Sequence, residues 1–346
     1  MEKISIYQRE QKVGGVTTRN ATNTLLHKAK KSKNDEFYTQ LLDIESELKH
    51  YEGHFKNKIV YCNCDDWETS NFVKYFQENF KRLGIRKLIS TCYIENGTGK
   101  FFEYNGIDIN TKLLEGDGDY ISQECIGFLQ QADIVVTNPP FSLFREYIGQ
   151  LVKYSKTFLA IANINAITYK EIFKLIKKNK IWLGINLGRG VSGFIVPAHY
   201  ELYGAEARID ENGNRIVSPN NCLWLTNMDN LKRHEYLDLT KSYIGGEVEY
   251  LQYDNYDGIN VNKTKDIPYD YQGAMGVPIT FLHKYNPDQF EIIKFRKGND
   301  EKDLSIHGKC PYFRILIRNK RYNCEQFESP KNIQNVASNS ATLSRL

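Results

Sequence analysis

The sequence predicts an α/β protein whose core is a Rossmann-like, doubly wound sheet, followed by a mixed, β-rich region with long loops. Two observations predict it. Strand and helix patterns alternate from about residue 58 to 185, and the alternation stops near residue 190, where glycine, asparagine, aspartate and tyrosine become more frequent. We therefore expect a flexible leader at 1–20, an α/β domain at 21–190, the β-rich region with strands that complete the sheet at 191–320, and a flexible tail at 321–346.

Local patterns divide the α/β part into elements. Residues 58–66 form a short apolar run, rich in β-branched and aromatic side chains, that ends in two acids and therefore predicts a buried strand. Residues 71–84 carry apolar side chains at helical spacing, and Gly84 is the expected C-cap. The same patterns predict strands at 86–95, 132–137, 157–164 and 181–185, and helices at 126–131, 142–154 and 167–179.

The β-rich region has weaker signals. Asn212-Gly213 lies between two short strand-like pieces within 207–218, which is typical of a hairpin. The runs at 221–228 and 276–285 have the composition of strands. We expect strands of this region to complete the sheet in part.

Composition limits the kinds of partner and site. The 346 residues include 46 lysines and arginines against 42 acids, so a net charge of +4 does not by itself demand a polyanionic partner. Seven cysteines without a CxxC pair predict neither a disulfide framework nor a structural metal, and they fit a reducing cytoplasm. The N-terminus lacks a signal peptide's apolar segment, and no apolar run approaches the ~18 residues of a membrane span. We expect a cytoplasmic protein with no metal and no membrane contact.

Polar and acidic residues follow three of the predicted strands. Asn63 and Asp65 end the first, Glu95 ends the second, and Asn138 follows the strand at 132–137. Ligands of doubly wound sheets bind outside the carboxyl ends of the strands. We therefore expect these residues to share one site.

The stretch Asn138–Phe141, Asn-Pro-Pro-Phe, predicts chemistry on a planar amine such as N6 of adenine. That nitrogen is a poor nucleophile, and two hydrogen-bond acceptors on its hydrogens would localise its lone pair and stabilise the charge that develops. The Asn138 side-chain oxygen is one acceptor and the Pro139 carbonyl, directed by the fixed φ angles of Pro139 and Pro140, is the other. Phe141 offers a ring on which a base can stack. The alternative is a rigid strand-to-helix turn without chemistry.

S-adenosylmethionine is the expected methyl donor. Glu95 would accept from its ribose hydroxyls, and Asp117 or Asp119 from its adenine amino group, although these acids could equally form a solvated loop. Phe37 or Tyr38 would pack against it, with core packing as the alternative. The first strand is not followed by the glycine-rich turn that usually approaches such a cofactor. We leave the choice among these acids open.

A short basic segment precedes these motifs. Residues 27–33 place five cationic or titratable side chains in seven positions, among them Lys28, Lys30, Lys31 and Lys33. They predict contacts with nucleic-acid phosphates, and the alternative is a solvated surface.

The order of these motifs resembles the EcoRI family of DNA adenine methyltransferases over roughly residues 18–320. The resemblance is carried by RNATN, LLHKAKKSK, DEFYTQ, VYCNCDD, DIVVTNPPFSLFREY, LGRGVSGFIVP, NNCLWLTN, INVNKTKDIP, GVPITFLHK and GKCPYFRILI. It implies a type II modification enzyme that methylates N6 of the inner adenine of GAATTC in duplex DNA, releases S-adenosylhomocysteine, and protects DNA from a partner endonuclease without a stable complex. It implies that 21–190 is the catalytic and cofactor-binding domain and 191–320 the target-recognition region. We expect a monomer.

The resemblance also assigns residues. Asn138, Pro139, Pro140 and Phe141 match the catalytic tetrad, and Phe194 matches a second aromatic that stacks on the target base. The cofactor site it implies comprises Asp35, Phe37, Tyr38, Thr39, Asn63, Asp65, Glu95, Asp117 and Asp119. This chain departs from the family in an extra leader before residue 18, an extra tail after residue 320 and a shorter loop between Glu95 and Gly116.

Methylation of a paired adenine requires the base to be flipped out of the duplex, so the enzyme must also hold and read the bases around it. Arginine and lysine reach guanine, whereas asparagine and glutamine reach adenine. Besides the four lysines of 27–33, the candidates are Arg189, Arg208, Asn212, Asn214, Arg215, Asn220, Asn221, Lys232, Arg233, His234, Asn260, Asn262, Lys263 and Lys265. For most of them the alternative is an ordinary polar loop surface.

Two other functions use the same features. One is an amino-group methyltransferase that acts on RNA or on a protein glutamine, and the other is a DNA-binding module without catalysis. The long polar region after residue 190 favours duplex DNA over a glutamine, and the intact tetrad argues against a pure binding module.

Overall fold

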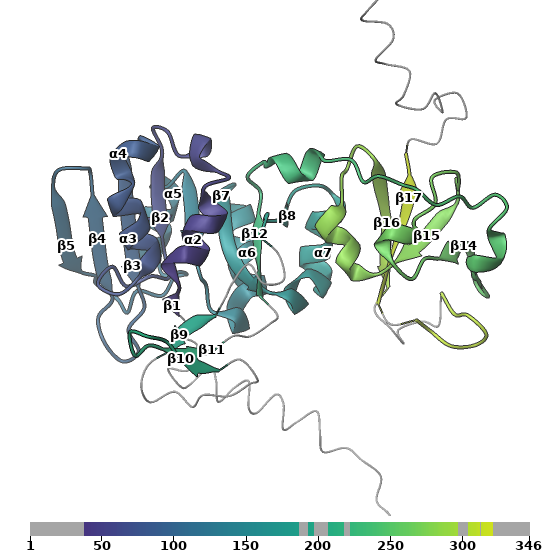
Figure 1. Ribbon diagram of the computed structural model, residues 1–346. Coiled ribbons are helices and arrows are strands. Elements are labelled where there is room, and N and C mark those ends of the chain that lie inside the picture. Colours follow the sequence, from purple (N-terminus) through teal and green to yellow (C-terminus); the bar gives the residue numbers. More distant parts are fainter. Residues whose placement is uncertain are drawn as a thin grey trace, which may run out of the picture. The chain divides into compact units, whose positions relative to one another are not determined.

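The structure is a computed structural model that describes residues 38–186, 193–196, 207–217, 222–296, 304–311 and 313–320. The predicted leader and tail, the basic segment 27–33, Asp35, Phe37, Arg189, Asn220 and Asn221 lie outside these residues. The chain divides into two compact units, shown in Figure 1. The first comprises the residues up to Tyr169 together with Gly184–Met228, and the second comprises Lys170–Leu183 and the residues from Asp229 onward.

The first unit contains a large mixed sheet, which confirms the α/β class. Within this unit, the order along the sheet is β5 (Ile109–Leu113), β4 (Lys100–Tyr104), β3 (Lys87–Cys92), β2 (Ile59–Cys62), β6 (Ile134–Thr137), β7 (Thr157–Asn163) and β12 (Cys222–Thr226). The strands β2, β3, β6 and β7 run parallel to their neighbours in this set, whereas β4, β5 and β12 are antiparallel.

The strands β4 and β5 were not predicted. The link from β3 to β4 spans only residues 93–99, too short for the helical crossover that a parallel neighbour needs, so the chain returns as an antiparallel strand. Every residue of β5 is exposed, so it lacks the alternation that marks a half-buried strand. The strand predicted at 221–228 is present as β12 and pairs with β7.

Helices connect the parallel strands. The helix α3 (Asn71–Glu78) begins after Ser70, whose hydroxyl accepts from the backbone N–H groups of Phe72 and Val73, and it buries Phe72 and Phe76 against the core. The single helix predicted at 71–84 is divided into α3 and α4 (Phe80–Leu83), and Gly84 ends α4 with a φ of 64°, as predicted for the C-cap. The helices of this unit are α2 (Leu41–Leu48), α3 (Asn71–Glu78), α4 (Phe80–Leu83), α5 (Gln123–Gln131) and α6 (Phe144–Lys153).

A small second sheet belongs to the same unit. Its hairpin turns at Gly213, with a φ of 80°, and confirms the Asn-Gly prediction. Its order is β1 (Tyr38–Thr39), β9 (Phe194–Val196), β11 (Arg215–Val217) and β10 (Arg208–Ile209). The strand pair β1–β9 places Thr39 opposite Phe194.

The second unit contains a five-stranded sheet. One prediction was wrong here: the strand expected at 276–285 stops at Val277, because Pro278 cannot donate to a ladder and instead begins a 3-10 helix, Ile279–Lys284. The sheet order is β13 (Gln252–Tyr253), β14 (Tyr256–Asn260), β15 (Ala274–Val277), β17 (Arg314–Asn319) and β16 (Phe290–Arg296). The helix α7 (Lys170–Lys177) and β8 (Trp182–Leu183) also belong to this unit.

No helix of the described chain is both long and apolar enough to cross a membrane. Its cysteines, Cys62, Cys64, Cys92, Cys125, Cys222 and Cys310, are free thiols. No group of three or more histidine, cysteine, aspartate or glutamate side chains among the described residues could hold a metal ion.

Candidate active site

The turn Asn138–Phe141 stands at the carboxyl end of β6, in the middle of the large sheet. Pro139 is buried and Asn138 is half-buried. Pro140 is extended, with φ −56° and ψ 122°, and its carbonyl accepts from the N–H of Leu143 at 3.0 Å, which starts the 3-10 turn Phe141–Leu143 ahead of α6. The predicted tetrad is therefore a rigid turn between a buried strand and a helix.

The two aromatic residues predicted to stack on a base lie together. The ring of Phe194 meets that of Phe141 edge to face, with 6.3 Å between centroids and 67° between planes. Phe194 is fully buried, whereas Phe141 is half-buried. Thr39, opposite Phe194 in the sheet, is also buried, and its hydroxyl has no hydrogen-bond partner within the described chain.

Asp65, at the end of β2, points into the protein. Its two oxygens accept from the hydroxyls of Ser70 at 2.7 Å and of Thr137 at 2.5 Å. The residue is 8% exposed, and burial raises the pKa of Asp65 from 3.8 to about 6, while the hydrogen bonds from Thr137 and Ser70 oppose that rise. Thr137 is the last residue of β6 and the neighbour of Asn138.

Asn63 is engaged in a similar way. Its side-chain oxygen accepts from the hydroxyl of Tyr147, on α6, at 2.6 Å, and both residues are buried. Both side chains that the sequence places at the end of β2 are thus tied to the elements that flank the tetrad.

The acids predicted for the cofactor lie on two loops that are bonded to each other. Ile94 donates to the carbonyl of Asp117 at 2.8 Å, and Gly99 donates to Gly116 at 2.9 Å. Gly118 has a φ of 84°, and a Cβ there would stand 2.1 Å from the carbonyl oxygen of Cys92, so only glycine permits this close approach.

Three carboxylates on these loops act electrostatically on one exposed aromatic side chain. Partial burial, and then the charges of Asp117, Glu95 and Asp119, raise the pKa of Tyr93. Tyr93 is 54% exposed, and Glu95 and Asp117 are exposed as well. Glu95 lies beyond β3, which ends at Cys92 instead of at the predicted residue 95.

The donor set fits the predicted cofactor, S-adenosylmethionine, in part. Exposed carboxylates beside an exposed ring suit the hydroxyls and adenine of an adenosyl group, and the unsatisfied buried hydroxyl of Thr39 offers a polar partner beside Phe194. Asn63 and Asp65 face other side chains, as described above.

The DNA-binding candidates fall in both units. Arg208 and Asn212 are exposed on the hairpin of the first unit, and Arg215 is half-buried. Asn262, Lys263 and Lys265 are exposed in the second.

Two further candidates are held within the second unit. Asp229 contacts the guanidinium of Arg233 at 3.1 Å and the ring of His234 at 2.9 Å. Arg233 also stacks on Trp182, with 3.6 Å from its guanidinium carbon to the ring centroid. Their role in DNA binding stays a prediction.

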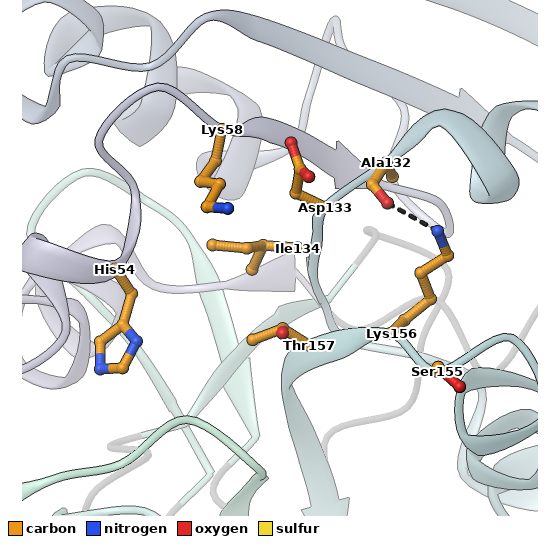
Figure 2. A pocket seen from close by; sticks show the side chains of 8 residues that line it. All are labelled: His54, Lys58, Ala132, Asp133, Ile134, Ser155, Lys156 and Thr157. Atoms are coloured by element: carbon orange, nitrogen blue, oxygen red, sulfur yellow. Dashed lines mark hydrogen bonds between the residues drawn. The ribbon is translucent and has the colours of Figure 1, made fainter.

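A hollow of about 330 Å³, shown in Figure 2, lies at the amino ends of β6 and β7, whereas Asn138 lies beyond the carboxyl end of β6. Ile134 and Thr157, the first residues of β6 and β7, line it together with Lys58, which precedes β2. Lys156 closes one side by donating to the carbonyl of Ala132 at 2.7 Å. Because Asn138 follows the other end of β6, this hollow is not the place of the predicted reaction.

Sequence reasoning missed four residues around the site: Ser70, Tyr93, Thr137 and Tyr147. The position of Tyr93, two residues before Glu95 at a strand end, was a usable signal. Ser70 and Tyr147 gave none, because hydroxyl residues before or within helices usually serve as caps or core side chains.

The comparisons with known proteins show which family the chain belongs to. A sequence model of the family described as adenine-specific methyltransferase EcoRI matches residues 25–320. The chain is 67% identical over 321 residues to the type II methyltransferase M.EcoRI of Escherichia coli, which covers 88% of this chain and 98% of the relative. It is 39% identical over 313 residues to the type II methyltransferase M.MpnI of Mycoplasma pneumoniae and 37% identical over 313 residues to M.MgeORF184P of Mycoplasma genitalium, each covering 85% of this chain and 98% of the relative. No solved structure matches the chain.

Proposed function

The chain belongs to the EcoRI family of adenine-specific methyltransferases, and we propose that it methylates N6 of the inner adenine of GAATTC in duplex DNA. One observation carries the proposal: the Asn138–Phe141 turn stands at the carboxyl end of the central strand β6, with the ring of Phe141 supported from its edge by Phe194. In a type II restriction-modification system this modification protects DNA from a partner endonuclease, without a stable complex between the two proteins.

In the proposed mechanism the target adenine leaves the duplex and stacks on Phe141. Phe194 is fully buried, so it holds the ring of Phe141 from the side instead of presenting a second open face. The Asn138 side-chain oxygen and the Pro139 carbonyl accept from the two hydrogens of N6, which keeps the nitrogen lone pair localised and stabilises its developing positive charge. Neither acceptor is a base, so the proton released from N6 passes to water.

The proposed cofactor is S-adenosylmethionine, which supplies an electrophilic methyl group when bound and leaves as S-adenosylhomocysteine. Glu95 would accept from its ribose hydroxyls, and Asp117 or Asp119 from its adenine amino group. Tyr93 would pack its exposed ring against that adenine, because the charges of the same three acids act on this side chain. Thr39 would donate its buried hydroxyl to the cofactor, and Tyr38, its neighbour on β1, would pack against the cofactor.

The proposal also covers the domain organisation of the chain. The large sheet would be the Rossmann-like, doubly wound sheet of this cofactor class, with residues 21–190 as the catalytic and cofactor-binding domain and 191–320 as the target-recognition region. The exposed residues Arg208, Asn212, Asn262, Lys263 and Lys265 are the described candidates for DNA contacts. We propose a monomer that acts in the cytoplasm.

Methyl transfer to defined duplexes tests this function. Purified full-length protein and S-adenosylmethionine with a tritiated methyl group are incubated with three short duplexes. The first carries GAATTC, the second carries N6-methyladenine at the inner adenine of both strands, and the third carries it at the outer adenine. We expect label in the first and third duplexes and none in the second.

Label in the second duplex but not the third would move the target to the outer adenine. Label only in RNA or in protein glutamine would replace DNA by the alternative substrates. No label in any substrate would refute the activity.

A further inference from the structure

We propose that Asp65 is a positioning residue of the active site, whose carboxylate holds Thr137, and through it Asn138, instead of contacting the cofactor. This inference rests on the proposed function and deepens it, because it concerns the placement of the same catalytic turn. It gives a role to the acid at the end of β2 that differs from the cofactor contact expected from its place in the sequence.

The carboxylate has both of its oxygens occupied by hydroxyl donors. Ser70 Oγ donates to Oδ1 at 2.7 Å, and Thr137 Oγ1 donates to Oδ2 at 2.5 Å. Thr137 is 0% exposed and Asp65 8%, so water competes little for these bonds. A carboxylate is the side chain that accepts from two hydroxyls on two oxygens, whereas an amide has one oxygen and a donating nitrogen.

The backbone of Asp65 is fixed from the other side of β2. Its N–H donates to the carbonyl of Thr91 at 3.1 Å, and its carbonyl accepts from the hydroxyl of Ser90. Both partners lie on β3. The residue therefore transmits the position of β3, and of the α3 N-cap at Ser70, to the last residue of β6.

The other end of the catalytic turn is tied to the same segment. Tyr147, on the helix α6 that follows the tetrad, donates to Asn63 Oδ1 at 2.6 Å. The segment 63–65 thus holds the strand before the turn and the helix after it. Because a displacement of about 1 Å can lower a rate by about a hundredfold, such a clamp sets the position of the Asn138 oxygen relative to N6.

The experiment compares Thr137→Val, which keeps the shape of the side chain and removes its hydroxyl, with Thr137→Ser, which keeps the hydroxyl. Asp65→Asn tests the acceptor. Thr226→Val is the matched control, because Thr226 is also a fully buried strand threonine of the large sheet whose hydroxyl donates to a carbonyl, that of Phe158, at 2.6 Å.

Two quantities are measured on each full-length variant: the single-turnover rate of methyl transfer to a GAATTC duplex, and the Kd for S-adenosylmethionine by calorimetry. Circular dichroism and thermal melts confirm that each variant is folded. We expect Thr137→Val and Asp65→Asn to lower the single-turnover rate by about tenfold or more, with the Kd changed by less than about threefold. Thr137→Ser and Thr226→Val should keep rates within about threefold of the wild type.

Three outcomes would overturn the assignment. An increase in Kd with an unchanged rate in Asp65→Asn would show a cofactor contact. Normal rates in Asp65→Asn and Thr137→Val, with an active wild type, would overturn the positioning role alone. A wild type that transfers no methyl group to any substrate would overturn the proposed function and this role together.

Discussion

Replacing Asp65 by asparagine is expected to make the stability of the protein less dependent on pH. The carboxylate is buried between β2, β3 and β6, and burial raises the pKa of Asp65 from 3.8 to about 6. The folded state therefore holds a proton on this group more tightly than the unfolded chain does. The contribution of Asp65 to wild-type stability therefore falls as the pH rises from its unfolded pKa of 3.8 to its folded pKa of about 6, and it is lost above that range.

The size of the effect follows from the two pKa values. At about 1.4 kcal/mol per pH unit, the rise from 3.8 to about 6 equals about 3 kcal/mol of free energy of unfolding, of which roughly half is lost between pH 5 and 8. Asp65 interacts electrostatically with Cys62, Cys64, Cys92 and Tyr147. Burial raises the pKa of each of these groups, so they stay uncharged in this range.

The assay is urea denaturation of the full chain and of Asp65→Asn, without ligands, at several values between pH 5 and 8. The difference in free energy of unfolding between variant and wild type should move in favour of the variant by about 1.5 kcal/mol from pH 5 to pH 8. A difference that stays constant with pH, or moves in favour of the wild type, would refute the raised pKa of Asp65 and the cost of burying its charge. Together with a lowered rate of methyl transfer in Asp65→Asn, the expected result would show that the ionised Asp65 lowers the stability of the protein but supports the reaction.

Three further predictions concern the cofactor loops and the aromatic pair. Glu95→Gln should raise the Kd for S-adenosylmethionine by about tenfold, because a charged acceptor is lost. The control Glu103→Gln, on β4, should leave the Kd unchanged. Equal Kd values for the two variants by calorimetry would contradict the assignment of Glu95. Gly118→Ala should also weaken cofactor binding by about tenfold, because its Cβ would stand 2.1 Å from the Cys92 carbonyl oxygen and displace the loop of Asp117; wild-type binding in that variant would show that the loop has no part in the site. Phe194→Ala should lower the free energy of unfolding by about 3–5 kcal/mol. Phe194→Leu should lower it by less, yet it should still reduce the fluorescence change of 2-aminopurine placed at the target base. A normal fluorescence change in Phe194→Leu would exclude a role of Phe194 in holding the flipped base.

The sequence predicted the parts of the fold that have a local pattern. The strand β6, the helix α3, the Gly84 C-cap of α4 and the hairpin at Gly213 were expected, because apolar spacing, a left-handed glycine and an Asn-Gly turn are visible in short windows. The hairpin β4–β5 was not expected, since β5 is exposed throughout and has no periodicity to detect. The 3-10 helix after Pro278 shows that a proline outweighs a strand-like composition.

The site was predicted as a set of residues but not as a set of contacts. The strand predicted at 58–66 ends at Cys62, so Asp65 lies just beyond it, and nothing in the sequence shows that its side chain points inward to Ser70 and Thr137. Thr137 is 72 residues away along the chain, and no spacing rule connects it with an acid on another strand. Tyr93 could have been named from its position two residues before Glu95, but the meeting of its loop with that of Asp117, which Gly118 permits, could not be foreseen.

The most direct test of the central claim is protection of DNA by the wild type and by Asn138→Ala. A plasmid with a single GAATTC site is incubated with protein and S-adenosylmethionine and then digested with an endonuclease that cuts GAATTC, and binding of each protein to the same duplex is measured in parallel. We predict that the wild type leaves the plasmid uncut, and that Asn138→Ala binds the DNA but transfers methyl groups at least about a hundredfold more slowly and so leaves the site cleavable. Protection by Asn138→Ala at the wild-type rate, or no protection by the wild type, would contradict the account.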